Sequence, residues 1–361
     1  MRILDRYILK RYLITFIFTL LILIPIAIAI DIAEKIDKFL SSDTLTLFEI
    51  VNDYYLNFII YYANTFMPLA LFVAVIFFTS KLSNNTEIVA ITNARISFTR
   101  FLFPYMVGAT LVTILALAMN HFVVPNSSKI RKKFEKTYIS KHKYGDDVVQ
   151  NFSLQLSDST YIFIRNFNLK NNTGFDFSTE LYDGDRIKQK LTSNFITWKP
   201  KDSTFRLSKY KMRRIFKNRD SIFSGVTLDT VFPFSPKDLL YKAALAQEMP
   251  SNELYSFIKT SQRRGVKNLN SYLVEFHKRT SLPMASYFLT IIAVALAFKK
   301  RRGGTGVNLA LGFGLMFIYI FFLKVSEVLG AVAGANSLLT VWIPNIVFGT
   351  LAFYLYYNAR K

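Results

Sequence analysis

Basic side chains gather just beyond the ends of two long apolar runs, where they could bind phosphate groups. Lys35 and Lys38 follow the first run and stand among the acidic residues Asp31, Glu34 and Asp37. Lys and Arg donate charge-assisted hydrogen bonds to phosphate oxygens. A solvated helix end has the same composition, so that alternative stays open. The cluster after the third apolar run consists of Lys129, Arg131, Lys132 and Lys133.

Lys324 and Glu327 lie inside another apolar run, three positions apart. At this spacing two helical side chains share a face and can pair. Ionisable groups within a membrane span usually face a bundle interior or a water-filled cavity. We expect an intramembrane polar pair, either functional or a structural pair near the end of the span.

Patterns for catalysis, metal binding and nucleotide hydrolysis are missing from the sequence. The chain has no cysteine, and His121, His142 and His277 have no second ligand at metal-binding spacing. The glycine-rich stretch 301–306 lacks the Lys-Ser/Thr ending of a phosphate-binding loop. We therefore predict no catalytic residue, metal or cofactor here, and expect any ATP and Mg²⁺ to be bound by a partner chain.

A membrane part and a soluble part must together position these side chains. Of 361 residues, 52% are hydrophobic, which is too many for a soluble protein, yet 19% are charged, which is too many for bare membrane spans. The formal net charge of +21 would suit nucleic acid, but basic residues at membrane borders explain it as well. We predict no nucleic-acid partner.

Six apolar runs are each long enough to cross a hydrocarbon core of about 30 Å as a helix. The positive-inside rule places the loops that are rich in Lys and Arg on the cytoplasmic side. Here these are the N-terminus, 81–100, Lys299–Arg302 and the C-terminus. Both termini are therefore predicted to be cytoplasmic. The runs cover about 12–30, 58–79, 101–124, 282–298, 307–329 and 338–357.

The long segment between the third and fourth runs is predicted to lie outside and to be all-β. Apolar and polar residues alternate in short stretches that are separated by turn sequences such as NNTG and DGD. Many short strands at this spacing favour a sandwich or an open barrel. The predicted strands are 152–156, 161–165, 175–177, 187–191, 195–198, 205–215 and 222–228.

After these strands the apolar period changes to that of helices, first from Ser251 and again from about Asn270. The predicted division of the chain is therefore four-part: spans one to three over 1–124, an all-β domain over 125–250, linking helices over 251–280, and spans four to six over 281–361.

The polar stretch 81–104 separates spans two and three. Asn84 followed by Glu87 has the form of a capping box, and Ile88 and Ile91 follow at helical spacing. We predict a short amphipathic helix over about 84–95 at the membrane surface. An ordinary loop is the alternative.

Several motifs resemble the LptF/LptG family of lipopolysaccharide export permeases, over nearly the whole chain. LDRYI at Leu4–Ile8 is more similar to LptG than to LptF, and TFMPLAL in the second span, Glu87-Ile88-Val89 and WIPN at Trp342–Asn345 are also similar. The resemblance extends to Tyr272, Glu275, Arg279 and Pro283.

The resemblance implies an integral membrane protein with six transmembrane helices and an inserted periplasmic jellyroll-like domain, in the bacterial inner membrane. Such a permease would take lipopolysaccharide from the outer leaflet and pass it to an LptA-like periplasmic bridge. The implied partners are an LptF-like second permease, an LptB-like cytoplasmic ATPase dimer and an LptC-like single-span protein.

The resemblance also implies that the helix over 84–95 couples this chain to the ATPase, through Glu87, Ile88, Ile91 and Arg95. Asn93 and Arg95 stand where the family has a small residue and a glycine, so the end of this helix is expected to dock differently. Basic residues at the outer end of the first span contact lipid phosphate in this family, and Lys35 and Lys38 are the nearest matches. A membrane-anchored enzyme that modifies a lipid or glycan, and an envelope receptor or scaffold, are the competing functions.

Overall fold

The computed structural model describes residues 3–41, 45–139, 148–157, 159–184, 186–200, 202–216, 219–236, 243–263, 269–298, 304–332 and 334–360. Two sequence predictions fall outside these ranges: that His142 is no metal ligand, and that the basic loop 299–302 is cytoplasmic. The chain forms two compact units, which we describe separately: a membrane unit of 1–139, 246–254 and 270–361, and a β unit of 140–245 and 255–269.

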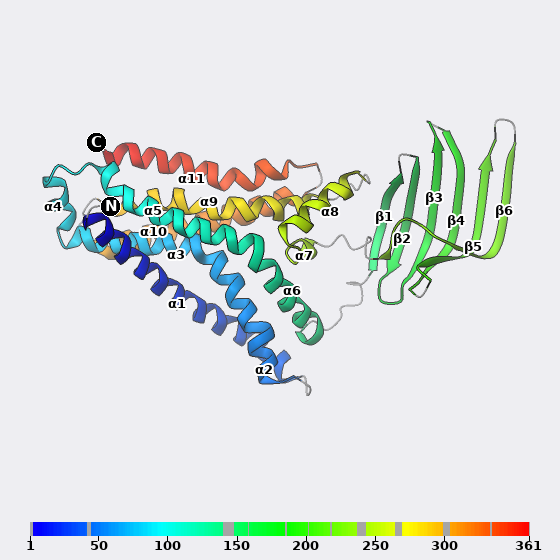
Figure 1. The fold of residues 1–361 in the computed structure, drawn as a ribbon, viewed down its shortest axis with the longest axis horizontal. Helices are drawn as coiled ribbons and strands as arrows, with labels where there is room; N and C mark the ends of the chain where they lie inside the picture. The colour runs from blue at the N-terminus through cyan, green and yellow to red at the C-terminus, as the bar shows by residue number, and fades with distance from the viewer. Residues whose placement is uncertain are drawn as a thin grey trace. The chain divides into compact units, whose positions relative to one another are not determined.

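Six helices among the described residues are long and apolar enough to cross a membrane, as predicted. Two of them include π-helical turns, η1 in the second span and η2 and η3 in the third, and Figure 1 shows the succession of the main elements. The first spans and the helix between them are α1 (Ile3–Leu40), α2 (Leu47–Glu49), η1 (Ile50–Tyr55), α3 (Leu56–Asn84), α4 (Glu87–Asn93), α5 (Phe98–Ala118), η2 (Met119–Val123), α6 (Val124–Phe134) and η3 (Glu135–Ile139). The later helices are α7 (Ala243–Ala246), α8 (Ser251–Arg263), α9 (Asn270–Phe298), α10 (Gly304–Ala331) and α11 (Ser337–Arg360).

The third span is longer than its apolar run. Helical structure continues from α5 through η2 and α6 to Ile139, so the first continuous part of the membrane unit runs to that residue. Pro125 lies in the first turn of α6, directly after η2. Proline donates no backbone hydrogen bond, and the π-helical turn just before it marks the point where the hydrogen-bonding pattern of the helix changes. The proline therefore does not end the helix.

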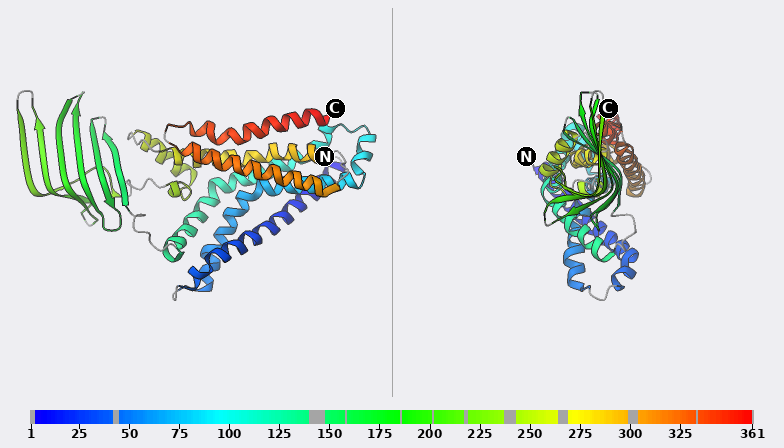
Figure 2. Two further views of the ribbon diagram at one scale, coloured as in Figure 1. Left: turned by 180° about the vertical axis from the view of Figure 1, so that it is seen from behind. Right: turned by 90° about the vertical axis from the view of Figure 1, so that its right-hand side faces the viewer.

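The centre of the membrane unit is formed by α9, which contacts α3, α5, α10 and α11. On the other side of α3, α1 packs against both α3 and α5. Figures 1 and 2 show that α1, the first half of α3 and α6 diverge from α9 and α11 toward α2. We call the two ends of this unit the α4 end and the α2 end.

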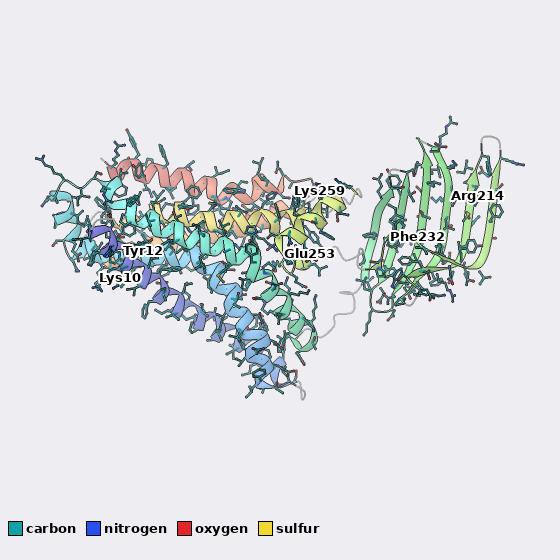
Figure 3. All side chains as sticks on the ribbon, viewed as in Figure 1. Lys10, Tyr12, Arg214, Phe232, Glu253 and Lys259 are labelled. Carbon is teal, nitrogen blue, oxygen red and sulfur yellow. The ribbon has the colours of Figure 1, made fainter. Side chains whose placement is uncertain are left out.

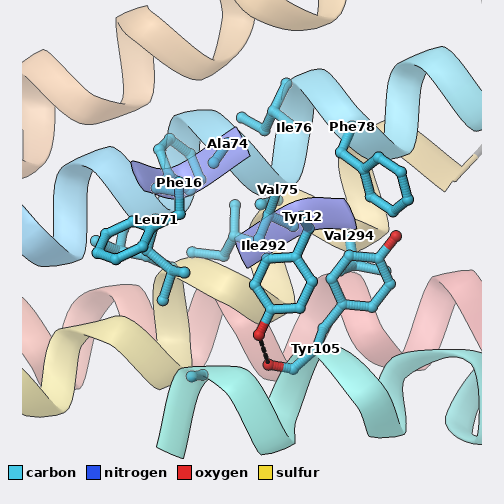
Figure 4. Packing of buried hydrophobic residues seen from close by; sticks show 14 of the residues in the cluster. Tyr12, Phe16, Leu71, Ala74, Val75, Ile76, Phe78, Tyr105, Ile292 and Val294 are labelled. Atoms are coloured by element: carbon cyan, nitrogen blue, oxygen red, sulfur yellow. Dashed lines mark hydrogen bonds between the residues drawn. The ribbon is translucent and has the colours of Figure 1, made fainter. Parts of the chain in front are cut away.

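A tight contact joins α1 to α5 inside the core (Figure 4). The hydroxyl group of Tyr12 donates a hydrogen bond of 3.1 Å to the carbonyl oxygen of Tyr105, and the two rings stack. Gly108 makes room for this contact, because a Cβ atom there would lie 1.4 Å from the Tyr12 hydroxyl oxygen. A side chain at position 108 would thus displace the Tyr12 ring and break its hydrogen bond to Tyr105.

Two spans leave most of their apolar surface uncovered. In the most apolar 18-residue stretch of α1 only 6% of residues are buried, and in that of α10 only 17%, against 56% for α3 and for α9. Lipid or another protein must cover these faces in the membrane. The exposed residues include Ile17, Phe18 and Leu21 of α1 and Phe317, Phe321 and Val328 of α10.

The β unit contains one antiparallel sheet whose strand order is β1-β2-β3-β4-β5-β6. Each strand pairs with its neighbour in the chain, so the described sheet is a meander. The family resemblance implied a jellyroll-like arrangement for this domain. The inserted all-β domain itself is confirmed. The strands are β1 (Val148–Ser157), β2 (Thr160–Asn168), β3 (Thr173–Asp183), β4 (Arg186–Lys199), β5 (Thr204–Ile215) and β6 (Asp220–Thr230).

Side-chain alternation shifts by one position in the middle of β2 to β6. In each strand two successive residues face away from the core, and the shift falls at matching positions of the paired strands. Asp176 and Lys209 have positive φ angles of 52° and 53° at two of these points. The sequence predicted 187–191 and 195–198 as separate strands because this shift, at Asn194, interrupts the alternation within β4.

The apolar face of the sheet is partly covered by the segment that follows β6. Phe232 and Phe234 pack against Phe205, with ring centroids 6.0 Å and 4.6 Å apart, and Phe232 also packs against Phe177. Figure 3 shows Phe232 over the middle strands. This segment supplies part of the core that a single sheet cannot provide alone.

Candidate functional site

The helix α4 connects spans two and three, as predicted, but it begins differently. Asn84 is the last residue of α3, and its side chain donates to the hydroxyl group of Thr305. The residue before α4 is Thr86, which has a φ of 62° and makes no side-chain cap. The predicted capping box of Asn84 and Glu87 is therefore wrong: a residue inside α3 cannot cap the following helix.

The two faces of α4 differ in exposure. Ile88 is 4% exposed and belongs to the membrane-unit core, and Ile91 packs against the same core. Val89 is 48% exposed, and Ala90, Thr92 and Asn93 are exposed too. Of the predicted coupling residues, Ile88 and Ile91 hold α4 to the bundle. The surface open to another protein is formed by their neighbours.

Arg95 follows α4 in the left-handed backbone conformation, with a φ of 57°. This conformation favours glycine, the residue that the family resemblance leads one to expect near this point. The side chain of Arg95 is exposed. The departure from glycine thus keeps the backbone turn and adds a cation beside the exposed face of α4.

Two polar contacts tie the start of α1 to the α4 region. The Tyr7 hydroxyl group donates a hydrogen bond of 3.3 Å to Glu87 Oε2. Arg100 Nη2 lies 2.7 Å from Asp5 Oδ2, and Asp5 is 2% exposed. Sequence analysis placed Asp5 and Tyr7 in the LDRYI motif but gave no sign of these contacts, because their partners lie on other helices.

At the α2 end, Asp31 is the centre of a buried polar group. Its carboxylate is 2.6 Å from Lys35 Nζ and accepts hydrogen bonds of 3.0 Å and 3.1 Å from the Tyr54 hydroxyl group. Tyr55 donates a longer bond of 3.4 Å to the same carboxylate. Lys35 also contacts the hydroxyl group of Tyr54. One of the predicted phosphate-binding lysines is thus held by its own chain.

Arg131 is likewise directed into the protein. It is 8% exposed, its guanidinium lies 4.6 Å from the centre of the Tyr61 ring, and its Nε atom is 3.8 Å from Glu135 Oε1. Lys35 Nζ is also 3.8 Å from Glu135. The two predicted basic clusters therefore meet at Glu135, which joins α1 to the end of the third span.

The remaining basic candidates are more accessible. Lys38, Lys129 and Lys133 are exposed, and Lys132 is half-buried. Within the described part of the chain, no ion pair is seen for the three exposed lysines. Their ammonium groups are the ones available to an anionic ligand at the α2 end.

The predicted pair of Lys324 and Glu327 is present, with Nζ and Oε2 3.0 Å apart. A third member was missed: Lys278 of α9 places its Nζ atom 2.6 Å from Glu327 Oε1. Glu327 thus joins α10 to α9, while the side chain of Lys324 stays 65% exposed. Pairing between helices leaves no pattern in a single sequence, so only the pair within α10 could be predicted.

Possible metal ligands do not gather in this arrangement. Among the residues that the structure describes, no group of three or more His, Cys, Asp or Glu side chains is placed to hold a metal ion.

Comparison with known proteins agrees with the motifs and with the fold. A search of curated proteins found no match. Residues 6–358 match the family described as lipopolysaccharide export system permease LptF/LptG. That description joins both permeases, so the similarity to LptG in particular stays a prediction. Since the match covers nearly all of a chain with six spans and an inserted β-sheet, the protein belongs to the LptF/LptG family of lipopolysaccharide export permeases.

Proposed function

We propose that this chain is one of the two permease halves of an ABC exporter, and that α4 is the helix through which a separate cytoplasmic ATPase dimer drives it. The observation that carries the proposal is the two-sided burial of α4. Ile88 fixes the helix to the bundle, while Val89, Thr92 and Asn93 face outward. A partner that binds the exposed face of such a short helix and moves it would also move the two spans that the helix connects.

The faces of α1 and α10 support a second, LptF-like permease as partner. They are long, apolar and mostly unburied in this chain. A related permease that packs against one or both of them would enclose a space between the two chains, open toward the outer leaflet of the inner membrane.

The exposed lysines at the α2 end suit the phosphate groups of lipopolysaccharide. Lys38, Lys129 and Lys133 lie beyond the apolar runs, close in sequence to the paired residues Lys35 and Arg131. In the proposed topology both termini and α4 are cytoplasmic, and this end faces the periplasm.

The β unit would then be periplasmic and would hand lipopolysaccharide to an LptA-like bridge, with an LptC-like single-span protein as a further partner. ATP and Mg²⁺ would bind to the LptB-like ATPase, and this chain would make or break no covalent bond.

Co-purification tests the coupling role. The full chain with Glu87→Arg should retain the second permease and lose most of the ATPase, because the new cation replaces the carboxylate on α4. Glu253→Gln is the matched control, since Glu253 is an exposed carboxylate on α8 (Figure 3). Equal recovery of the ATPase with both variants would remove α4 from the proposal.

Thiol labelling tests the topology, because the chain has no native cysteine. Ser83 is 2% exposed and would be shielded, so Asn85→Cys is the better reporter for the α4 end. An impermeant reagent should label Asn171→Cys but not Asn85→Cys in cells whose outer membrane has been permeabilised. Labelling of the second site under these conditions would invert the topology.

Depletion separates transport from lipid modification. Loss of an export permease should leave chemically normal lipopolysaccharide in the inner membrane. Loss of a modifying enzyme should change the structure of the lipid, and loss of a receptor should do neither.

A further inference from the structure

The guanidinium group of Arg279 is the most completely bonded cation in the described part of the membrane unit. Arg279 is 3% exposed. Its Nη1 atom donates to Ser251 Oγ at 2.7 Å, and its Nη2 atom donates to the carbonyl oxygens of Ala246 and Met249 at 2.8 Å and 2.7 Å. Nε faces Glu275 at 3.7 Å. Three of these four partners belong to one short segment, 246–251.

The same residue is joined to two other spans. The Asn120 side chain, in η2 of the third span, donates 3.1 Å to the backbone carbonyl oxygen of Arg279. Asn64 of α3 donates 2.6 Å to Asn120 Oδ1. A buried chain of hydrogen bonds therefore runs from α3 through η2 to α9.

His121, the neighbour of Asn120, connects η2 directly to the segment 246–251. Its Nδ1 atom lies 2.7 Å from Ser251 Oγ. The Ser251 hydroxyl group already accepts from Arg279, so its own proton is available for Nδ1. The Ser251 hydroxyl group is thus a point that η2 and α9 share, and α9 also holds the segment through the carbonyl oxygens of Ala246 and Met249.

At this segment the chain first returns from the β unit to the membrane unit, before residues 255–269, which belong to the β unit again. The last strand ends at Thr230, α7 ends at Ala246, and α8 begins at Ser251. π-Helical turns within helices occur frequently at functional sites, and η2 carries both Asn120 and His121. A movement of η2 relative to α9 would therefore move the point at which the return segment is held.

We infer that Arg279 is a positioning residue that fixes the return segment 246–251 to spans two, three and four, so that movement of the spans during transport reaches the connection to the β unit. The inference rests on the proposed function and adds a route for it: lipid would pass from the membrane unit to the β unit only while this segment is held. Arg279 is not assigned any contact with lipid.

The chemistry explains why an arginine is needed. A planar guanidinium has five donors in a fixed fork and can serve a hydroxyl group and two carbonyl oxygens at once. Lysine keeps the charge but places three donors on one atom, so it cannot reproduce separate contacts made by Nη1 and Nη2. Arg279→Lys therefore changes the geometry without removing the cation.

The first test follows the position of the segment without any transport. Gln247 is half-buried within it, and Gln247→Cys gives a single thiol in the chain. In the assembled transporter, Arg279→Lys should raise the labelling rate of this thiol by about tenfold, the factor expected when a hydrogen bond to a charged group is lost. Ser251→Ala should give a smaller increase, and Glu253→Gln should give none. An unchanged rate in Arg279→Lys would overturn the inference.

The second test separates two stages of lipid passage. Photo-crosslinkers replace Ile36, an exposed residue of α1, and Phe223, which pairs with Met212 on the apolar face of the sheet. In reconstituted transporter with lipopolysaccharide and ATP, Arg279→Lys should keep the crosslink at position 36 and lose about nine-tenths of that at 223. A parallel loss at both positions, with a lower melting temperature, would show a merely structural role and contradict the inference.

Failure of the proposed function looks different. If the chain does not carry lipopolysaccharide, the otherwise unaltered protein will crosslink to it at neither position. The labelling rate of Gln247→Cys would still report whether Arg279 holds the segment.

Discussion

Asp5 and Arg100 form an ion pair of 2.7 Å between the first turn of α1 and the start of α5, with α4 between them in the chain. The carboxylate is 2% exposed, whereas the Arg100 side chain is 34% exposed. Removing the cation from a buried carboxylate costs more than removing both charges together. The pair therefore fixes where α1 starts relative to the region that would receive the ATPase.

Arg100→Gln should lower the melting temperature because it leaves the buried carboxylate of Asp5 without its cation, and Asp5→Asn combined with Arg100→Gln should lower it less than the two single changes together. Thermal unfolding of the full chain in detergent gives both values. A double variant as unstable as the sum of the two single variants would show that the residues do not interact.

Gly108→Ala should weaken the contact between α1 and α5. The added methyl group would lie 1.4 Å from the Tyr12 hydroxyl oxygen, so Tyr12 must move and lose its bond to Tyr105. Overpacking of this kind typically costs about 1–3 kcal/mol. Gly314→Ala is the matched control, because nothing lies within 4 Å of a Cβ atom there. If both variants melt at the same temperature, the close approach is not needed.

Ile88 and Val89 should respond in opposite ways to the same substitution. Ile88→Glu places a charge in the core and should prevent stable folding. Val89→Glu should leave the melting temperature nearly unchanged and reduce ATPase recovery about tenfold, as expected for loss of a central interface contact. Normal recovery with Val89→Glu would mean that the exposed face of α4 is not the contact surface.

Glu327 should matter more than Lys324, although they were predicted as a pair. Glu327→Gln leaves Lys278, which is 18% exposed, beside a neutral group, and should cost about 2 kcal/mol in thermal unfolding. Lys324→Met should cost less than about 0.5 kcal/mol, because its side chain is 65% exposed. A larger loss of stability in Lys324→Met than in Glu327→Gln would place the stabilising contact within α10 and not between α10 and α9.

Asp229 should make the β5–β6 pairing sensitive to acid. Hydrogen bonds from Arg206 and Lys199 lower the pKa of Asp229 below its usual value near 4. A lowered pKa stabilises the fold above the unfolded-state pKa, and the stabilisation is lost as the pH falls through the folded-state pKa. Amide hydrogen exchange of β6 in the full chain should therefore be about two- to fivefold faster in Asp229→Asn than in the original sequence at pH 7. The difference should shrink as the pH falls below 4; a constant ratio would exclude this carboxylate as its source.

The long apolar runs and the alternation of apolar and polar residues were sufficient to predict six spans and an inserted all-β domain. Burial in lipid and alternation in a sheet both leave patterns along the chain. The strand order could not be predicted, since many pairings share the same alternation. The two predicted strands around Asn194 became one because a shift in alternation resembles a break.

The candidate site was predictable only where its members are close in sequence. The pair of Lys324 and Glu327 follows from helical spacing, but Lys278 comes from another helix. The capping box failed for a physical reason of the same kind: how far α3 extends depends on its packing against α10, which Asn84 and Thr305 show and the local sequence does not.

The attachments of α1 have a mechanical consequence. Near one end it is held by the buried residues Asp5, Ile8, Tyr12 and Phe16, and near the other by Asp31 and Lys35. Between Phe16 and Asp31 its contacts are looser: Leu20, Leu23, Ala27 and Ile28 pack against neighbouring helices but are only partly buried. That interval is about 20 Å long at 1.5 Å per residue, and it contains Pro25, which donates no backbone hydrogen bond. α1 can therefore bend near Pro25 by shifting only its partly buried contacts, while the buried contacts of Asp5 and Asp31 at its two ends are kept.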